Sequence, residues 1–250
     1  MNIQYCSDLH LEFAANRNFL TKRPLIPKGE ILLLAGDIMP FSILEKYSDF
    51  IDFASDHFSA VYWVPGNHEY YDYDVAKKTG SFLEKIRENF FLVNNQSVRY
   101  KNINLVFSTL WSLITPGNEW DIQRSVSDFS LIKENGRKLS PSQFSSMHRE
   151  SIAFLDAAVK SQGPGTTIII THHVPTLMNY PSIYKNNVLT EAFATELYDF
   201  IECCGADYWI YGHHHINTPE FKIGSTRLIT NQMGYASQYE HKSFRRDAVI

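Results

Sequence analysis

The amino-acid sequence predicts an α/β fold with a mixed β-sheet, or with two sheets packed together. Short apolar runs alternate with amphipathic segments, and most of the apolar runs stop abruptly at polar residues. Turn-like residue pairs also separate apolar runs near the middle and the end of the chain. With 250 residues, 44% of them hydrophobic and 20% charged, the chain can bury a sizeable core in a single domain, 1–250.

The expected strands are short apolar or β-branched runs. Such runs suit strands that are buried on both faces, where side chains need not alternate between apolar and polar. The expected strands cover residues 3–6, 31–35, 61–64, 105–107, 167–170 and 208–211.

Four amphipathic segments between these runs are expected to be helical, at 42–57, 75–89, 141–160 and 190–203. The third has the clearest start signal. Ser140 can cap the helix, Pro141 fits its first turn, and Gln143 completes a capping box.

Antiparallel pairing is expected in two places. The Asn-Asn pair at 94–95 and the Lys-Asn pair at 101–102 look like hairpin turns. A further hairpin is expected between 220–223 and 227–230. A purely parallel sheet is therefore not expected.

Residues 112–139 show no clear periodicity and carry aromatic and polar side chains, among them Trp120 and Arg124. Long loops in compact domains commonly serve as lids or binding loops. We therefore expect a lid or pocket loop at 112–139.

Composition restricts the partners and the location. The net charge of −4 offers no electrostatic argument for a nucleic-acid partner. The three cysteines make no disulfide framework and are interpreted as buried thiols in a reducing compartment. The N-terminus is too short and too polar for a signal peptide, and no apolar run is long enough for a membrane span. We expect a cytoplasmic protein, and the sequence leaves its oligomeric state open.

Metal-binding residue types gather where the apolar runs stop. Because ligands bind at the carboxyl ends of strands in open α/β sheets, these segments are expected to build one site. They are Asp8-Leu9-His10, Gly36-Asp37, Gly66-Asn67-His68-Glu69, Thr171-His172-His173 and Gly212-His213-His214-His215.

The spacing and the residue types both suit metal ions. In an extended segment residues i and i+2 point the same way, so Asp8 and His10 can face one ion. Glycines before the key residues allow a close backbone approach. Imidazole, carboxylate and amide ligands without thiolate favour Mn, Fe, Zn, Co or Ni over a structural zinc site.

Taken in order, the five motifs resemble those of the calcineurin-like metallophosphoesterase superfamily, and they span residues 8–215. The fold implied by this resemblance is a four-layer α-β-β-α sandwich with two mixed β-sheets. The resemblance also implies two divalent or trivalent metal ions. The first would be held by Asp8, His10 and His215, the second by Asn67, His172 and His213, and Asp37 would bridge the two.

The same resemblance implies a catalytic role for His68, which would donate a proton to the leaving oxygen or stabilise the phosphoryl group. Glu69 or Asp37 would orient it. His172 is preferred to His173 as a ligand because it lies directly at the strand end.

The implied reaction is the hydrolysis of a small phosphomonoester or phosphodiester by a hydroxide that bridges two ions. Candidate substrates include nucleotides, cyclic nucleotides, phospholipid head groups and phosphoproteins. The alternatives are an inactive member that serves as an interaction scaffold, and a metal-dependent nuclease. A nuclease would normally need a basic groove, which this acidic chain does not suggest.

Some aromatic and polar residues are candidates for the pocket lining, with core packing as the equal alternative. They are Trp111, Trp120, Tyr180, Tyr184 and Tyr235, with Arg124 as a possible phosphate partner. His214 would face either the substrate or the solvent.

Overall fold

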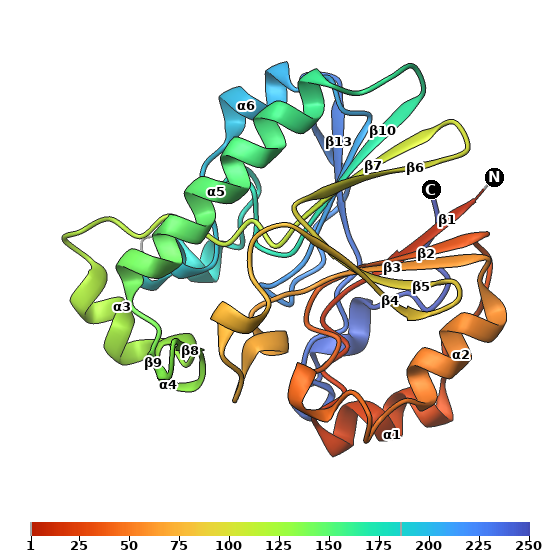
Figure 1. Cartoon of the computed structure of the whole chain (residues 1–250), viewed down its shortest axis with the longest axis horizontal. Helices are drawn as coiled ribbons and strands as arrows, with labels where there is room; N and C mark the ends of the chain where they lie inside the picture. The colour runs from red at the N-terminus through yellow and green to blue at the C-terminus, as the bar shows by residue number, and fades with distance from the viewer. Residues whose placement is uncertain (1, 186) are drawn as a thin grey trace.

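A computed structural model describes residues 2–185 and 187–250. Two β-sheets pack face to face, and helices cover their outer faces (Figure 1). This is the expected α-β-β-α order of layers, with two mixed sheets.

The first sheet has the strand order β1-β2-β3-β5-β4, and only β4 runs antiparallel to its neighbour. Consecutive apolar residues in its central strands point to opposite faces, as the strand period of two requires. Leu33 faces the second sheet, whereas Leu32 and Leu34 face the helices. The strands are β1 (Ile3–Cys6), β2 (Ile31–Ala35), β3 (Ala60–Val64), β4 (Phe82–Arg87) and β5 (Phe90–Asn94).

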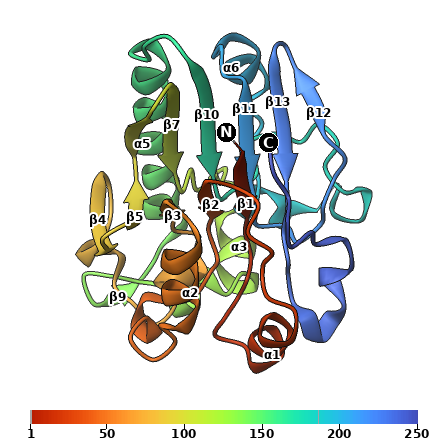
Figure 2. The same ribbon diagram turned by 90° about the vertical axis from the view of Figure 1, so that its right-hand side faces the viewer.

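The second sheet has the strand order β12-β13-β11-β10-β7-β6, with antiparallel pairs at both edges. Its central strands are parallel, so β10, β11 and β13 point the same way (Figure 2). The strands are β6 (Gln96–Tyr100), β7 (Ile103–Ser108), β10 (Thr166–Thr171), β11 (Tyr208–Tyr211), β12 (Phe221–Ile223) and β13 (Thr226–Thr230).

Helices cover the outer face of each sheet. On the first sheet lie α1 (Ala14–Lys22) and α2 (Asp49–His57), and on the second lie α5 (Pro141–Lys160) and α6 (Tyr198–Cys203). The apolar core therefore has three parts: one between the sheets and one under each helical layer.

The segment 75–89 was expected to be a helix, and this prediction is wrong. It forms a short 3-10 turn, Val75–Lys77, and then the edge strand β4. Phe82 and Ile86 are four residues apart, a spacing that places them on one face of a helix and equally on one face of a strand. Both pack against the core beneath the first sheet, and pairing with β5 decides the outcome.

Three further expectations need correction. The pair at 94–95 is a crossing between the sheets, because β5 lies in the first and β6 in the second; only 101–102 makes a hairpin. The predicted helices 42–57 and 190–203 shorten to α2 and α6. Cys6 is buried as expected, but Cys203 is exposed and Cys204 is half-buried, and all three cysteines are free.

The segment 112–139 contains two short helices and a two-stranded ribbon. They are α3 (Glu119–Ser125), α4 (Asp128–Leu131), β8 (Lys133–Glu134) and β9 (Arg137–Lys138). The other 3-10 turns are Phe41–Ile43, His68–Tyr70, Ser182–Tyr184, Val188–Ala192, Ala236–Gln238 and Glu240–Ser243. Within the described residues, no helix combines the length and apolar character that crossing a bilayer requires.

The predicted capping box at the start of α5 is present. The Gln143 backbone N–H donates to the Ser140 hydroxyl at 3.3 Å, and the Gln143 side chain accepts from the Ser140 backbone N–H at 2.9 Å. These bonds satisfy donors that the first helical turn leaves free.

We expect Ser140→Ala to lower the free energy of unfolding by about 1 kcal/mol, because it removes this N-cap acceptor. Ser146→Ala, at an exposed position within the same helix, is the matched control and should be neutral or slightly stabilising. Urea unfolding of both variants measures the difference. Equal midpoints would show that the cap does not contribute.

Candidate metal centre

The five predicted segments converge where the parallel strands end. Asp8 and His10 follow β1, Asp37 follows β2, and Asn67 follows β3. From the second sheet, His172 follows β10, and His213 and His215 follow β11. Six of these seven side chains are buried, and His215 is nearly so.

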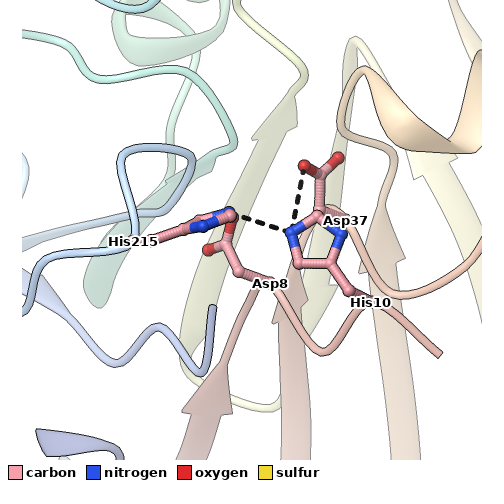
Figure 3. A group of neighbouring side chains, drawn as sticks. All are labelled: Asp8, His10, Asp37 and His215. Atoms are coloured by element: carbon pink, nitrogen blue, oxygen red, sulfur yellow. Dashed lines mark hydrogen bonds and ion pairs between the residues drawn. The ribbon is translucent and has the colours of Figure 1, made fainter. Parts of the chain in front are cut away.

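Asp8, His10, Asp37 and His215 form the first group, in which one potential ligand atom from each lies within 4.8 Å of the others. Figure 3 shows these side chains pointing toward one another. The Nε2 atoms of His10 and His215 lie 2.9 Å apart. The Nε2 atom of His215 lies 3.4 Å from Asp8 Oδ1, and that of His10 lies 3.7 Å from Asp37 Oδ2.

Asp37, His172 and His213 form the second group. The Nε2 atom of His172 lies 3.3 Å from Asp37 Oδ1, 3.0 Å from His213 Nδ1 and 3.1 Å from Asn67 Oδ1. The Asn67 amide oxygen therefore joins this group. Asp37 belongs to both groups and offers a different oxygen to each.

These donors fit metal ions. Asp8 and Asp37 are buried carboxylates whose ion-pair partners in the described residues are all histidines. Burying carboxylates without a compensating cation is costly. Two pairs of imidazole nitrogens also face each other across about 3 Å, an arrangement that a cation between them would relieve. The mixture of imidazole, carboxylate and amide donors suits Mn, Fe, Zn, Co or Ni.

Hydrogen bonds on the far side of the imidazole rings orient three of the histidines. His172 Nδ1 donates to the Ala35 carbonyl at 2.9 Å, which leaves its Nε2 facing the centre. His10 Nδ1 contacts Glu12 Oε1 at 3.1 Å, and His215 Nδ1 contacts Glu240 Oε2 at 2.8 Å.

Neither of these glutamates was predicted from the sequence. Glu12 follows His10 by two residues, as His10 follows Asp8, and this spacing could have predicted that Glu12 lies at the same site. Glu240 comes 25 residues after His215, and nothing in the sequence pattern connects the two.

Asn67 is held by a residue from the 112–139 segment. Its Nδ2 atom donates to Asp128 Oδ1 at 2.8 Å, and Tyr71 OH donates to the same oxygen at 2.8 Å. Because the amide nitrogen is engaged on this side, the amide oxygen faces His172. Asp128 is buried and was also missed by the sequence analysis.

The backbone at the centre is unusual. Asp8, His10, Asp37, His213 and His215 all have left-handed φ angles, between 47° and 84°. The convergence of residues i and i+2 therefore comes from left-handed conformations and not from an extended chain. Such conformations are uncommon outside glycine and cluster at functional sites.

Gly36 and Gly66 leave room for the side chains of His172 and Asp37. A Cβ atom on Gly36 would clash with the His172 ring, and one on Gly66 would clash with Asp37 Oδ1. A side chain at either position would displace a predicted ligand. The expectation from the sequence, that these glycines permit a close backbone approach, has this steric basis.

His68 lies beside the first group, and its side chain is 9% exposed. Its Nδ1 atom contacts Glu12 Oε1 at 2.7 Å, and its Nε2 atom lies 4.0 Å from Asp37 Oδ2. Burial alone would lower the pKa of His68, but the Asp37 and Glu12 carboxylates raise it above its usual value. His68 can therefore carry a proton next to the centre.

Glu69 does not orient His68, contrary to one expectation from the sequence. It accepts backbone N–H bonds from Asp37, Ile38 and Gly66 at 2.6–3.0 Å, and the indole N–H of Trp63 at 3.0 Å. It thereby ties the loop after β2 to the loop after β3. The carboxylate that contacts His68 Nδ1 is that of Glu12.

His173 and His214 lie outside both groups. His173 packs against Trp111 and the His213 ring, and burial keeps its pKa well below the usual value. His214 Nδ1 accepts from the Gln232 amide at 2.8 Å, and burial lowers the pKa of His214 to about 4. Both are therefore neutral near pH 7.

A pocket of about 390 Å³ opens over the centre and is lined by Asp37, Asn67 and His68 among others. Only some of the aromatic residues that were candidates for the pocket lining lie there. Tyr180, Tyr184 and Tyr235 line this pocket.

The other aromatic candidates lie elsewhere. Trp111 is buried in the core against Tyr70 and Phe144. Trp120 is 65% exposed and lies under the Arg124 guanidinium, 4.3 Å from the ring centroid. Arg124 is therefore occupied away from the pocket, whose lining from this segment comes from residues 125–128.

Comparisons with known proteins agree with this fold. The family described as calcineurin-like phosphoesterase matches residues 1–217. The chain is 30% identical to the uncharacterized protein L509 of Acanthamoeba polyphaga mimivirus, over 99% of this chain and 95% of that protein. It is similar in structure to the phosphopantetheinyl hydrolase PptH of Mycobacterium tuberculosis, with a TM-score of 0.69 and 16% identity over 96% of this chain and 92% of that one. The match over residues 1–217, most of the chain, shows that this chain belongs to the calcineurin-like phosphoesterase family.

Proposed function

We propose that this protein is a metal-dependent phosphoesterase that uses two metal ions to hydrolyse a phosphomonoester or phosphodiester. The observation that carries the proposal is the position of Asp37. It belongs to both ligand groups, and His68 lies next to it at the floor of an open pocket. The seven residues predicted from the sequence would hold the ions, and we propose the same ligand set here.

When bound, two such ions would supply an activated water and neutralise the charge on the phosphoryl oxygens. The protein contributes the fixed positions of the donors. Glu12, Glu240 and the Ala35 carbonyl orient the imidazole rings, and Asp128 orients the Asn67 amide. These contacts hold the donors in place without reorganisation.

His68 is proposed as the general acid. Its Nδ1 atom is engaged by Glu12, so its Nε2 atom faces the pocket side, where Tyr235 OH lies 3.4 Å away. The neighbouring carboxylates favour the protonated ring. In this position the ring can deliver a proton to the leaving oxygen of an ester, a contribution typically worth about 10² to 10⁴ in rate.

The interaction-scaffold alternative would require that ligands or the acid had been lost, whereas all eight residues are present and clustered. The cytoplasmic location predicted from the sequence stays a prediction, supported by three free thiols.

Metal content tests the ligand set. We expect the protein to bind about two ions per chain after purification with Mn²⁺ or Zn²⁺ supplied, and Asp37→Ala to bind fewer and to lose turnover. Asp37 is the shared donor, so its removal weakens both groups. Elemental analysis of the desalted protein gives the count, and His57→Ala, at an exposed position on α2, is the control. Less than one ion per wild-type chain would contradict the proposal.

The leaving group tests the acid. We expect His68→Asn to reduce turnover by about 10² to 10⁴ for an alkyl phosphate, and by much less for 4-nitrophenyl phosphate, whose leaving oxygen needs no proton. Glu12→Gln should show the same pattern more weakly, because it removes the charge that favours protonated His68. His68→Asn should retain about two ions, whereas Glu12→Gln also loses the contact that orients His10, so its turnover is compared per bound ion. An equal loss on both esters in His68→Asn would reject the acid role.

A further inference from the structure

We propose that the organic part of the substrate is aromatic or apolar and carries no negative charge beyond the phosphoryl group. This proposal rests on the proposed function and deepens it by naming a class of ester. It follows from the side chains that surround the pocket above the metal centre.

One wall of the pocket is an aromatic surface that begins at the proposed ligands. The Phe193 ring stacks on His213 with a centroid distance of 4.8 Å. The Tyr180 ring lies 5.6 Å from that of His214 and 6.2 Å from that of Tyr184. All three aromatic residues line the pocket and come from one segment, 180–193.

Tyr235 extends this surface on the side of the first ligand group. Its ring lies 4.6 Å from the His215 ring, and its hydroxyl lies 3.4 Å from His68 Nε2. A leaving group protonated by His68 would therefore emerge between aromatic rings. Rings at this place favour a planar or apolar group over a strongly hydrated one.

The charged side chains of the pocket also favour a substrate without a second anionic group. No lysine or arginine occurs among its described lining residues, whereas the carboxylates of Asp128 and Glu240 do. Near the pocket segments, Arg124 covers Trp120 and Lys242 lies 5.5 Å from the Tyr239 ring centroid, while Lys185 is exposed beside Tyr184 and is not among the lining residues. With the phosphoryl group taken by the two proposed ions, an additional anion on the substrate would find no lysine or arginine in the lining to pair with.

The apolar character continues outside the pocket. Ile183 is 73% exposed, and Leu177 and Met178 are each 40% exposed, in the same loop region that supplies Tyr180 and Tyr184. An apolar group longer than the pocket would therefore meet further apolar surface. Nucleoside di- and triphosphates and nucleic acids would instead bring more phosphates to a pocket lining without lysine or arginine.

Two esters of equal shape test the charge preference. The metal-loaded protein should hydrolyse 4-carbamoylphenyl phosphate with a kcat/KM about tenfold higher than 4-carboxyphenyl phosphate, because only the second carries an extra anion. Ser125→Arg should shrink or reverse this ratio, since Ser125 is exposed and lines the pocket. Ser125→Gln, which adds length without charge, should leave the ratio unchanged.

Binding provides a measurement that does not depend on turnover. By calorimetry, phenylphosphonate should bind about tenfold more tightly than methylphosphonate, and Tyr184→Ala should reduce this advantage. Equal affinities in the wild type, or equal kcat/KM for the two aryl esters, would overturn the pocket proposal and leave the proposed function standing. Loss of all phosphate-ester hydrolysis in a protein holding two ions would overturn both.

Discussion

The Asp37 carboxylate is the constraint on which the rest of the site depends. One oxygen faces each ligand group, and its Oδ1 atom also accepts the His68 backbone N–H at 2.9 Å. To serve all three, Asp37 must sit where the two sheets meet, at the end of β2. The space beside this carboxylate is too small for a side chain, so position 66 is glycine. Glu69 lies beneath it and accepts the backbone N–H groups of Asp37 and Gly66, which this position leaves free.

The fold holds this carboxylate in place by burying the strands on both faces. The loops that carry the donors are short and follow directly from buried strands, so they inherit the rigidity of the core. At least five residues there adopt left-handed φ angles, each at a cost on the order of 1–3 kcal/mol. The three-part core offsets that cost.

Much of the fold and of the candidate site could be predicted from the sequence, because metal-binding residue types follow recognisable strands. The buried strands at 3–6, 31–35 and 208–211 have the predicted bounds. The edge strand β4 could not be distinguished from a helix, because Phe82 and Ile86 satisfy both periodicities. The orienting residues Glu240 and Asp128 escaped prediction for another reason: each contacts its partner across a long stretch of chain, at a distance that no local pattern encodes.

Asp128 belongs to the segment that walls the pocket, and at the same time it holds the amide of Asn67. This wall of the pocket is thus joined by a hydrogen bond to a residue of the proposed metal centre. Replacing residues 112–139 with the matching segment of a relative would remove the hydrogen bond that holds Asn67, unless the new segment also placed an acceptor at position 128. The rings of Tyr180 and Phe193 instead pack beside His214 and His213, so substitutions at these two positions would leave the hydrogen bond between Asp128 and Asn67 in place.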